Sequence, residues 1–417
     1  MNAPPQLFVR SVPLPDDRDL LAHLPDDAPL AWLHGGSGLV AWGEAARVVL
    51  PARTEPGDVQ RFTAAARWFA GLEPQVDDQV RRPGSGLMAF GSFAFDPRSD
   101  GSTLVVPRVA VGRDRSGTWL TTIGDQPGRH PAELLAPHAP PRPVGPLRWT
   151  DGARTAEDWG TQVATAVRRI RGGAYDKVVL ARDRYAEAES PIDPRTLLAR
   201  LAADYPTCYA FTVDGLTGAT PELLIRREGE DLTSLVLAGT APRGGTEVED
   251  RRLGQDLAES AKNAEEHRYA VDSLRDRLAP LCTAFDAPDR PELLRLANVQ
   301  HLASPVRATL RPGASTLDVV AAMHPTAAVG GTPTEAAVEA IRGLEGMDRG
   351  RYAGPVGWID ADGNGEWGIA LRCAQLDGPR ARLIAGCGIV AGSRPEEEIT
   401  EADAKFEVMR AALTDGE

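Results

Sequence analysis

Residues 209–237 read YAFTVDGLTGATPELLIRREGEDLTSLVL, and this stretch decides the fold class of the chain. Apolar and β-branched runs recur in it every few residues, and turns that contain glycine separate them. This pattern is typical of consecutive short strands. Strands that follow one another in groups favour an α+β fold with antiparallel sheets over a doubly wound sheet, in which strands and helices alternate.

Helices and strands are predicted on both sides of this stretch. A helix over 155–172 carries apolar residues at helical spacing and closes on Gly172-Gly173. Further expected elements are a strand over 177–186, a helix near 194–203, one long helix over 250–278, a strand over 381–390 and a helix over 395–413.

The first part of the chain predicts strands over 86–95 and 103–111 and one helix near 57–71. A proline-rich connection, 124–147, holds seven prolines and three glycines. Because proline fixes φ and donates no backbone hydrogen bond, this connection is expected at the surface. It separates a variable part, 1–123, from a region over 148–417 that holds all the motifs suggesting chemistry.

The composition is that of a globular, acidic chain. Its 417 residues can bury a large core, and 46 basic against 59 acidic side chains give a formal charge of −13. This charge argues against nucleic acid or an anionic membrane as the main partner. No apolar run approaches the ~18 residues of a spanning helix, and the N-terminus lacks a signal-peptide pattern. The four cysteines show no C-x-x-C spacing, so we expect a cytoplasmic protein without a zinc site or disulfides.

Two charged residues border apolar strands, where an unpaired charge is costly. Lys177 opens the run Val178–Ala181 and shares a strand face with Val179. It could be a solvated strand end, or a partly desolvated amine that acts as a base near neutral pH. Glu222 precedes the apolar run Leu223–Ile225 and could likewise reach solvent, or it could be a proton donor with a raised pKa.

Three further positions could contact a ligand. The Gly239-Thr240 turn follows an apolar strand and offers N–H groups and a hydroxyl, although most such turns only reverse the chain. Arg372 stands in the predicted apolar strand 365–374, where an arginine is costly unless it pairs with an anion such as a carboxylate. Gly386 and Gly388 would let a ligand approach the backbone closely.

Acidic residues on two predicted helices could hold a divalent cation. Glu266 flanks the apolar stripe of the helix over 250–278, while Glu398, Glu401 and Lys405 line one edge of the last helix. Acidic first turns commonly serve only the helix dipole. Oxygen ligands from two helices would also suit Mg²⁺, which binds one or two carboxylates together with substrate oxygens.

Residues 150–415 resemble the chorismate-utilising enzymes, and among them the isochorismate synthases. The matching motifs stand in the family's order: DKVVLAR, ATPELL, LAGTAPRG, KNAEEH, NVQHLASPVRATL, MHPTAAVGGTP, RYAGPVGW, GEWGIALRCA and AGCGIVAGSRPEEEITEADAK. The resemblance implies two large antiparallel β-sheets that form a sandwich with helices packed outside. The first 120 or so residues match only loosely, yet they would complete that sandwich as part of one integrated domain. The implied activity is the isomerisation of chorismate to isochorismate.

The resemblance also implies a role for each matching residue. Lys177 falls on the base that activates water for attack at C2, and Glu222 falls on the acid that protonates the hydroxyl leaving C4. Glu266 and Glu401 fall on ligands of Mg²⁺, and Glu398 falls on a nearby carboxylate that acts through water. Positions that contact chorismate are implied at Gly239, Thr240, Ala328, Tyr352, Arg372, Gly386 and Lys405.

Alternatives within and beyond this family remain open. Members that use ammonia carry Gln where this chain has Lys177, so no glutaminase subunit is expected, and a monomer is the family's commonest state. Salicylate synthases keep the lysine and also eliminate pyruvate. The sequence around His324 and Gly330-Gly331 favours isochorismate synthase over salicylate synthase. A non-catalytic chorismate-binding protein would not need to keep the charged residues. Asn263, where the family more often has Asp, is not expected to touch the metal, and the pathway served, menaquinone or siderophore biosynthesis, stays open.

Overall fold

The computed structural model describes residues 6–26, 28–52, 59–126, 135, 138–295 and 299–414, except for the side chains of residues 59, 240, 262, 266 and 299. Within these residues the strands form two large sheets. All described strand pairs are antiparallel except β1 (Phe8–Leu14) with β5 (Gln75–Asp78), which is parallel. The α+β prediction with two antiparallel sheets is therefore confirmed.

The larger sheet has thirteen strands, and both parts of the chain contribute to it. In spatial order they are β10 (Leu147–Asp151), β11 (Lys177–Ala188), β23 (Arg380–Ile389), β22 (Cys373–Asp377), β13 (Leu216–Thr220), β12 (Tyr209–Val213), β2 (Leu30–His34), β3 (Ser37–Trp42), β8 (Val109–Asp114), β9 (Gly117–Gly124), β1 and β5, with β19 (Gly331–Thr332) paired to β11.

The smaller sheet has ten strands and is also shared between both parts of the chain. In spatial order they are β16 (Cys282–Asp286), β18 (Val299–Leu310), β15 (Asp231–Pro242), β14 (Leu223–Glu228), β21 (Gly365–Ile369), β20 (Pro355–Asp360), β6 (Met88–Ser92), β7 (Ser102–Val106) and β4 (Ala46–Leu50), with β17 (Glu292–Arg295) paired to β18. On this ground we propose that 1–123 and 148–417 fold as one integrated domain.

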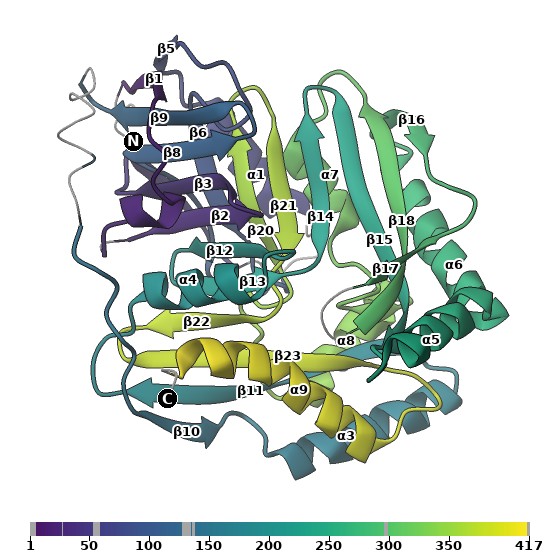
Figure 1. Ribbon diagram of the computed structural model, residues 1–417. Coiled ribbons are helices and arrows are strands. Elements are labelled where there is room, and N and C mark those ends of the chain that lie inside the picture. The colour runs from purple at the N-terminus through teal and green to yellow at the C-terminus, as the bar shows by residue number, and fades with distance from the viewer. Residues whose placement is uncertain are drawn as a thin grey trace.

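The helices pack on the outside of the sheets, as Figure 1 shows for α9 over β23. The described helices are η1 (Leu20–His23), α1 (Val59–Ala70), α3 (Ala156–Arg171), α4 (Pro194–Asp204), α5 (Glu247–Glu259), α6 (Ala261–Leu278), α7 (Thr316–Met323), α8 (Thr334–Glu345) and α9 (Pro395–Leu413). None of them is both long enough and apolar enough to cross a bilayer.

The prediction of one long helix over 250–278 is wrong, because Ser260 divides it into α5 and α6. Ser260 has extended backbone angles, φ −69° and ψ 110°, and its side chain accepts a hydrogen bond from the Asn263 N–H. A serine in this position caps the second helix. Apolar residues continue on both sides of the break, so their spacing alone could not reveal it.

The two sheets pack face to face through a shared core. Trp32 and Phe211 from the larger sheet and Phe90 and Trp367 from the smaller sheet belong to one buried cluster. The indole Nε1 of Trp32 also donates to Glu366 Oε2 at 2.6 Å across the interface. The apolar faces of both sheets are therefore buried against each other, which is the stable solution for two antiparallel sheets.

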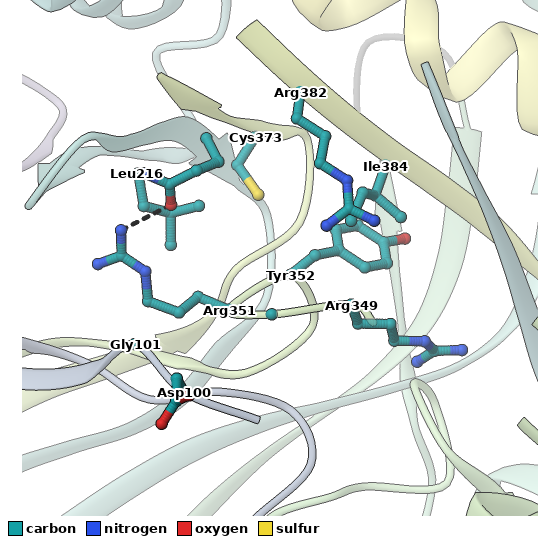
Figure 2. A pocket seen from close by; sticks show the side chains of 11 residues that line it. Asp100, Gly101, Leu216, Arg349, Arg351, Tyr352, Cys373, Arg382 and Ile384 are labelled. Carbon is teal, nitrogen blue, oxygen red and sulfur yellow. Dashed lines mark hydrogen bonds between the residues drawn. The ribbon is translucent and has the colours of Figure 1, made fainter. Parts of the chain in front are cut away.

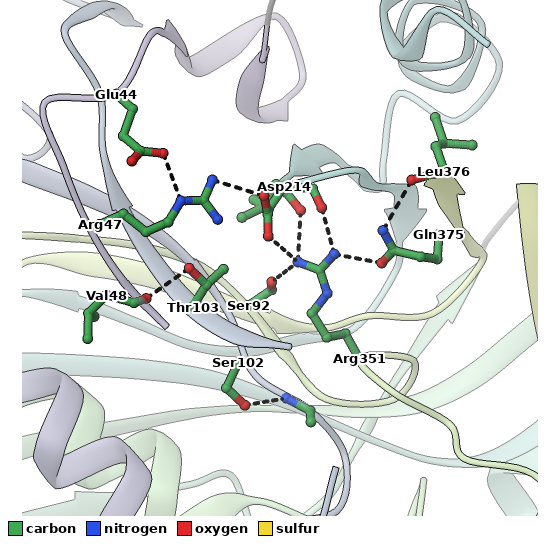
Figure 3. A network of polar contacts seen from close by, with 12 residues as sticks. Glu44, Arg47, Val48, Ser92, Ser102, Thr103, Asp214, Arg351, Gln375 and Leu376 are labelled. Atoms are coloured by element: carbon green, nitrogen blue, oxygen red, sulfur yellow. Dashed lines mark hydrogen bonds and ion pairs between the residues drawn. The ribbon is translucent and has the colours of Figure 1, made fainter. Parts of the chain in front are cut away.

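A buried arginine also joins the two sheets. The guanidinium of Arg351 donates to Ser92 in β6, to the Gln375 side chain in β22 and to the carbonyl oxygens of Val213 and Asp214 (Figure 3). Its charge lies 3.6 Å from an Asp214 carboxylate oxygen. These contacts hold β6 against the hairpin that joins β12 and β13.

The chain crosses from one sheet to the other at two neighbouring points. Pro221-Glu222 leads from β13 in the larger sheet to β14 in the smaller one, and residues 370–372 lead from β21 back to β22. The Ile369 N–H donates to the Glu222 carbonyl, and the Ala219 N–H donates to the Arg372 carbonyl, both at 3.1 Å. The two crossings are therefore bonded to each other, and each carries one predicted site residue.

Candidate active site

A pocket of about 70 Å³ lies beside the two crossings. Five residues predicted to contact substrate line it together: Ala328, Tyr352, Arg372, Gly386 and Lys405. They come from the loop before β19, the loop before β20, the second crossing, β23 and α9. These segments lie far apart in the sequence, so only the tertiary structure brings them to one pocket.

Lys177 is the first residue of β11, on the strand face that borders the pocket. Val179, two residues further on, lines the pocket, as the alternation of a strand requires. The aliphatic part of the Lys177 side chain lies over Gly388 of the neighbouring strand, because a Cβ at position 388 would lie 2.9 Å from Lys177 Cε. Gly388 thus provides the space that the lysine occupies.

Glu222 lies on the first crossing and is partly buried. Burial raises its pKa from 4.5 to about 7, and the positive charges of Arg372 and Lys177 act in the opposite direction. The charges of all three side chains therefore lie within electrostatic range of one another. Near neutral pH a large fraction of Glu222 is protonated, as a proton donor needs to be.

Arg372 does not lie in a strand, and in this respect the prediction for 365–374 is wrong. β21 ends at Ile369, and Arg372 has a left-handed backbone with φ +48°. Such a conformation is uncommon for a residue with a side chain and is concentrated at functional sites. Among the described residues its guanidinium has no hydrogen-bond or ion-pair partner, so its donors are available to an anion in the pocket.

Tyr352 is buried beside Arg372 and lines the same pocket. Burial raises the pKa of its hydroxyl, which keeps it protonated and able to donate. Within the part of the chain that the structure describes, this hydroxyl has no hydrogen-bond partner. A protonated phenol beside a free guanidinium is a suitable arrangement for a ligand carboxylate.

Two of the predicted metal ligands meet at the start of α9. Oxygen atoms of Glu398 and Glu401 and the Cys387 sulfur lie within 4.8 Å of one another. Burial raises the pKa of Glu398 and of the Cys387 thiol, so the cysteine stays protonated and the two carboxylates are the donors. Carboxylate oxygens are the ligands that Mg²⁺ prefers.

Lys405 joins this acidic pair to the pocket. Its ammonium group donates to Glu401 Oε1 at 2.7 Å and to the Gly386 carbonyl at 2.8 Å. Gly386 is packed so closely against β11 that a Cβ would lie 2.3 Å from the Leu180 carbonyl oxygen. The lysine therefore holds the carboxylate of one predicted metal ligand beside the pocket.

Two predicted site residues have side chains outside the described part, Glu266 and Thr240. The backbone of Glu266 lies in α6, and its neighbour His267 hydrogen-bonds the Ala238 carbonyl of β15 at 3.2 Å. Gly239 makes a bulge in β15 with φ +81°, in register between Ala238 and Thr240. A side chain at Gly239 would be strained by this backbone angle.

His301 lies in one of the motifs that match the family, but the sequence pattern assigns it no role. It lies in β18 opposite Thr240, and its ring bonds the Gly239 backbone. Burial lowers its pKa, and the positive charge of Arg372 adds to this effect. The imidazole is therefore mostly neutral near pH 7 and lies within electrostatic range of Arg372. The sequence signal that could have pointed to His301 is its position inside the matching motif NVQHLASPVRATL.

A larger cavity of about 230 Å³ adjoins this pocket and shares Arg349, Tyr352 and Ile384 with it. Figure 2 shows Arg382, Cys373 and Tyr352 at its walls. Of the described residues predicted to contact substrate, only Tyr352 lines the larger cavity, whereas five line the smaller pocket; Lys177 and Glu222 line neither. The smaller pocket is therefore the candidate active site.

Comparisons with known proteins show what the chain as a whole is similar to. A family model described as "Chorismate binding enzyme" matches residues 35–414. Isochorismate synthase MenF of Bacillus subtilis is 36% identical over 361 residues, which are 81% of this chain and 77% of the relative. A salicylate biosynthesis isochorismate synthase of Pseudomonas aeruginosa is 39% identical over 352 residues, covering 78% of this chain and 74% of the relative.

Solved structures agree as well. The menaquinone-specific isochorismate synthase MenF of Escherichia coli superposes with a TM-score of 0.81 at 28% identity, covering 99% of this chain and 96% of that one. Anthranilate synthase component I of Streptococcus pneumoniae has a TM-score of 0.74 at 23% identity, covering 89% and 91% of the two chains. The latter likeness concerns the fold alone.

Proposed function

Since the chain belongs to the chorismate-binding enzyme family, we propose that it is an isochorismate synthase, an isomerase that converts chorismate to isochorismate. Its relatives at 36% and 39% identity carry the name isochorismate synthase. The observation that carries the proposal for this chain is that Ala328, Tyr352, Arg372, Gly386 and Lys405 line one pocket, which lies beside the crossing that carries Glu222. A buried acid near a lysine and a free arginine suits proton transfer on an anionic substrate.

Lys177 and Glu222 would act as base and acid on the two sides of the ring. Lys177 takes a proton from a water molecule whose oxygen attacks C2. The ring double bonds shift, and the hydroxyl leaves C4 with the proton of Glu222, so one water enters and one departs. Burial of Glu222 supports the second role, because it keeps the proton on the carboxyl near neutral pH.

The remaining pocket residues would bind the two carboxylates of chorismate. Arg372 and Tyr352 have donors without partners among the described residues, which suits the enolpyruvyl carboxylate. Gly386 and Lys405 lie next to the acidic pair of α9, which suits the ring carboxylate near the metal. Gly239, Thr240 and Ala328 complete the proposed contacts.

Glu401 and Glu266, with Glu398 beside them, would hold Mg²⁺. The donor set fits this ion, because the described members offer carboxylate oxygens that lie close together and the nearby thiol is protonated. When bound, Mg²⁺ neutralises the ring carboxylate and polarises the ring toward attack. Without it, the substrate carboxylate would face the acidic residues directly.

Incubation of the chain with chorismate and Mg²⁺ tests this proposal. Isochorismate without pyruvate is the expected product, to be identified by chromatography and a coupled pyruvate assay. Salicylate together with pyruvate would indicate a salicylate synthase instead. Thermal stabilisation by chorismate without turnover would indicate a binding protein. Lys177→Ala serves as the inactive control.

We further propose that the enzyme acts as a cytoplasmic monomer without a glutaminase subunit. Lys177 supports the last point, since relatives that use ammonia carry Gln there. Turnover of chorismate by the purified chain, with neither glutamine nor ammonia present, together with a monomeric mass in solution, is the expected result.

A further inference from the structure

A buried ion pair adjoins the proposed active site. Glu345 is the last residue of α8, and Arg349 follows four residues later. Their side chains are 1% and 2% exposed, and the guanidinium meets the carboxylate at 2.6, 3.0 and 3.2 Å. Arg349 also lies 4.3 Å over the ring of Phe95 and lines the pocket.

This pair takes the place of a missing strand beside β11. One edge of β11 is paired with β19 at Lys177–Val178 and with β10 only from Arg184 onward. Between these two partners, the Val179 carbonyl accepts from Arg349 Nη2 at 2.7 Å, and the Ala181 N–H donates to Glu345 Oε1 at 2.7 Å. Side chains thus satisfy backbone groups that would otherwise be buried without partners, which is costly.

Arg349 is bonded to three segments that border the pocket on this side, through its side chain or its main chain. Val179 is two residues from Lys177 on β11. The Val329 carbonyl accepts from Arg349 Nη1 at 2.9 Å, and Val329 follows Ala328. The Tyr352 N–H donates to the Arg349 carbonyl at 3.1 Å. The Arg349 side chain therefore fixes the backbone next to Lys177 and next to Ala328, while the main chain of Arg349 is bonded to Tyr352.

We propose that Glu345 and Arg349 are positioning residues for catalysis, which hold the start of β11, and thereby Lys177, in place. This inference rests on the proposed function. A buried ion pair is in general a poor source of stability, because desolvation of two charges offsets their attraction. This pair instead bonds backbone groups at the start of β11, where no strand is paired along this edge, and so fixes the position of that backbone. The position matters, because displacement of a catalytic group by about 1 Å can lower the rate on the order of a hundredfold.

Arg349→Lys is the informative variant, since lysine keeps the charge and lacks the planar fork that reaches Glu345 and two carbonyl groups at once. We expect kcat to fall on the order of tenfold to a hundredfold. Arg342→Lys is the matched control. Arg342 lies on α8, the helix that ends at Glu345, and bridges the Asp96 carboxylate, with its Nε at 2.5 Å; among the described residues its polar contacts are with Asp96 and Glu339, which do not line the pocket. Its kcat should stay within about twofold of the parent.

The Lys177→Ala background separates positioning from a general loss of structure. If Arg349 acts through Lys177, Arg349→Lys should lower the residual turnover of that background by less than about twofold, because the group it positions is gone. An equal loss in both backgrounds, or a kcat for Arg349→Lys within about twofold of the Arg342→Lys control, would overturn the inference. Should Arg349→Lys not fold, Glu345→Gln decides by the same criteria, since it keeps the shape and the acceptor for the Ala181 N–H.

The two levels of the argument fail in distinguishable ways. Wild-type turnover in Lys177→Ala alone would refute the base assigned in the proposed function, whatever Arg349→Lys does. A large loss in Lys177→Ala with no effect of Arg349→Lys would leave the proposed function standing and remove only the positioning pair.

Discussion

Replacing Glu222 with Gln should abolish most activity and at the same time stabilise the protein at alkaline pH. Both effects follow from the burial of one carboxyl at the first crossing between the sheets. Loss of the proton donor should lower kcat by about 10²- to 10⁴-fold, the usual contribution of a general acid. In the parent enzyme, activity should also decline as the pH rises through about 7 and Glu222 loses its proton.

The effect on stability follows from the direction of the pKa shift. The folded chain binds the Glu222 proton more tightly than the unfolded chain does, since the pKa rises from 4.5 to about 7 on folding. The contribution of Glu222 to stability is therefore most favourable below pH 4.5 and falls as the pH rises toward 7, by about 3 kcal/mol in total for this shift. Gln carries no such proton, so the variant escapes this loss.

Urea unfolding at a series of pH values measures the effect. From pH 5.5 to pH 8 the free energy of unfolding of Glu222→Gln should gain about 2 kcal/mol on that of the parent. Glu228→Gln, at the exposed end of β14, removes a carboxyl from the same strand and serves as the control. A difference between Glu222→Gln and the parent that does not change with pH, or a parent-like kcat in the folded variant, would refute the reasoning.

Four further predictions concern the pocket. Gly388→Ala should lower kcat on the order of tenfold to a hundredfold with little change in KM, because a Cβ would lie 2.9 Å from Lys177 Cε and displace the base; unchanged kcat would argue against that base. Arg372→Ala should raise KM for chorismate at least about tenfold, as expected for loss of a charge-assisted contact, and a normal KM in folded protein would exclude it from the site. EDTA should abolish turnover, and excess Mg²⁺ should restore it. Lys405→Met should bind Mn²⁺ more tightly than the parent in the absence of substrate, as measured by electron paramagnetic resonance, because in the parent Lys405 pairs with Glu401 at 2.7 Å. Equal Mn²⁺ affinities of variant and parent would show that the lysine does not compete with the metal.

Much of the secondary structure could be predicted from sequence because its causes are local. The helix over 155–172 and the strand that begins at Lys177 follow from the spacing of apolar residues, and both are present as α3 and β11. The break at Ser260 and the left-handed backbone of Arg372 escaped prediction. A single capping residue and a single φ angle leave the apolar pattern around them unchanged, so the pattern contains no sign of them.

Hydrogen bonds between residues that are far apart in the sequence could not be predicted either. The Ala181 N–H and the Glu345 carboxylate lie 164 positions apart, and nothing in either local sequence indicates that one completes the hydrogen bonding of the other. The pair Glu345 and Arg349 looks like an ordinary surface pair at helical spacing, four residues apart. Only the tertiary structure shows that this ion pair is buried against β11 and bonds its backbone.

The sequence by itself indicated many of the strands and helices and several charged residues that could do chemistry, because periodicity and side-chain type are properties of short segments, and the family resemblance added the other site residues. Only the tertiary structure decided that Glu222 and Arg372 lie on neighbouring crossings, and that Glu222 holds its proton near pH 7. The physical reason is that the pKa of a carboxyl depends on how far water is excluded and which charges lie nearby. Here the nearby charges belong to Arg372 and Lys177, which lie 150 and 45 positions away from Glu222 in the chain.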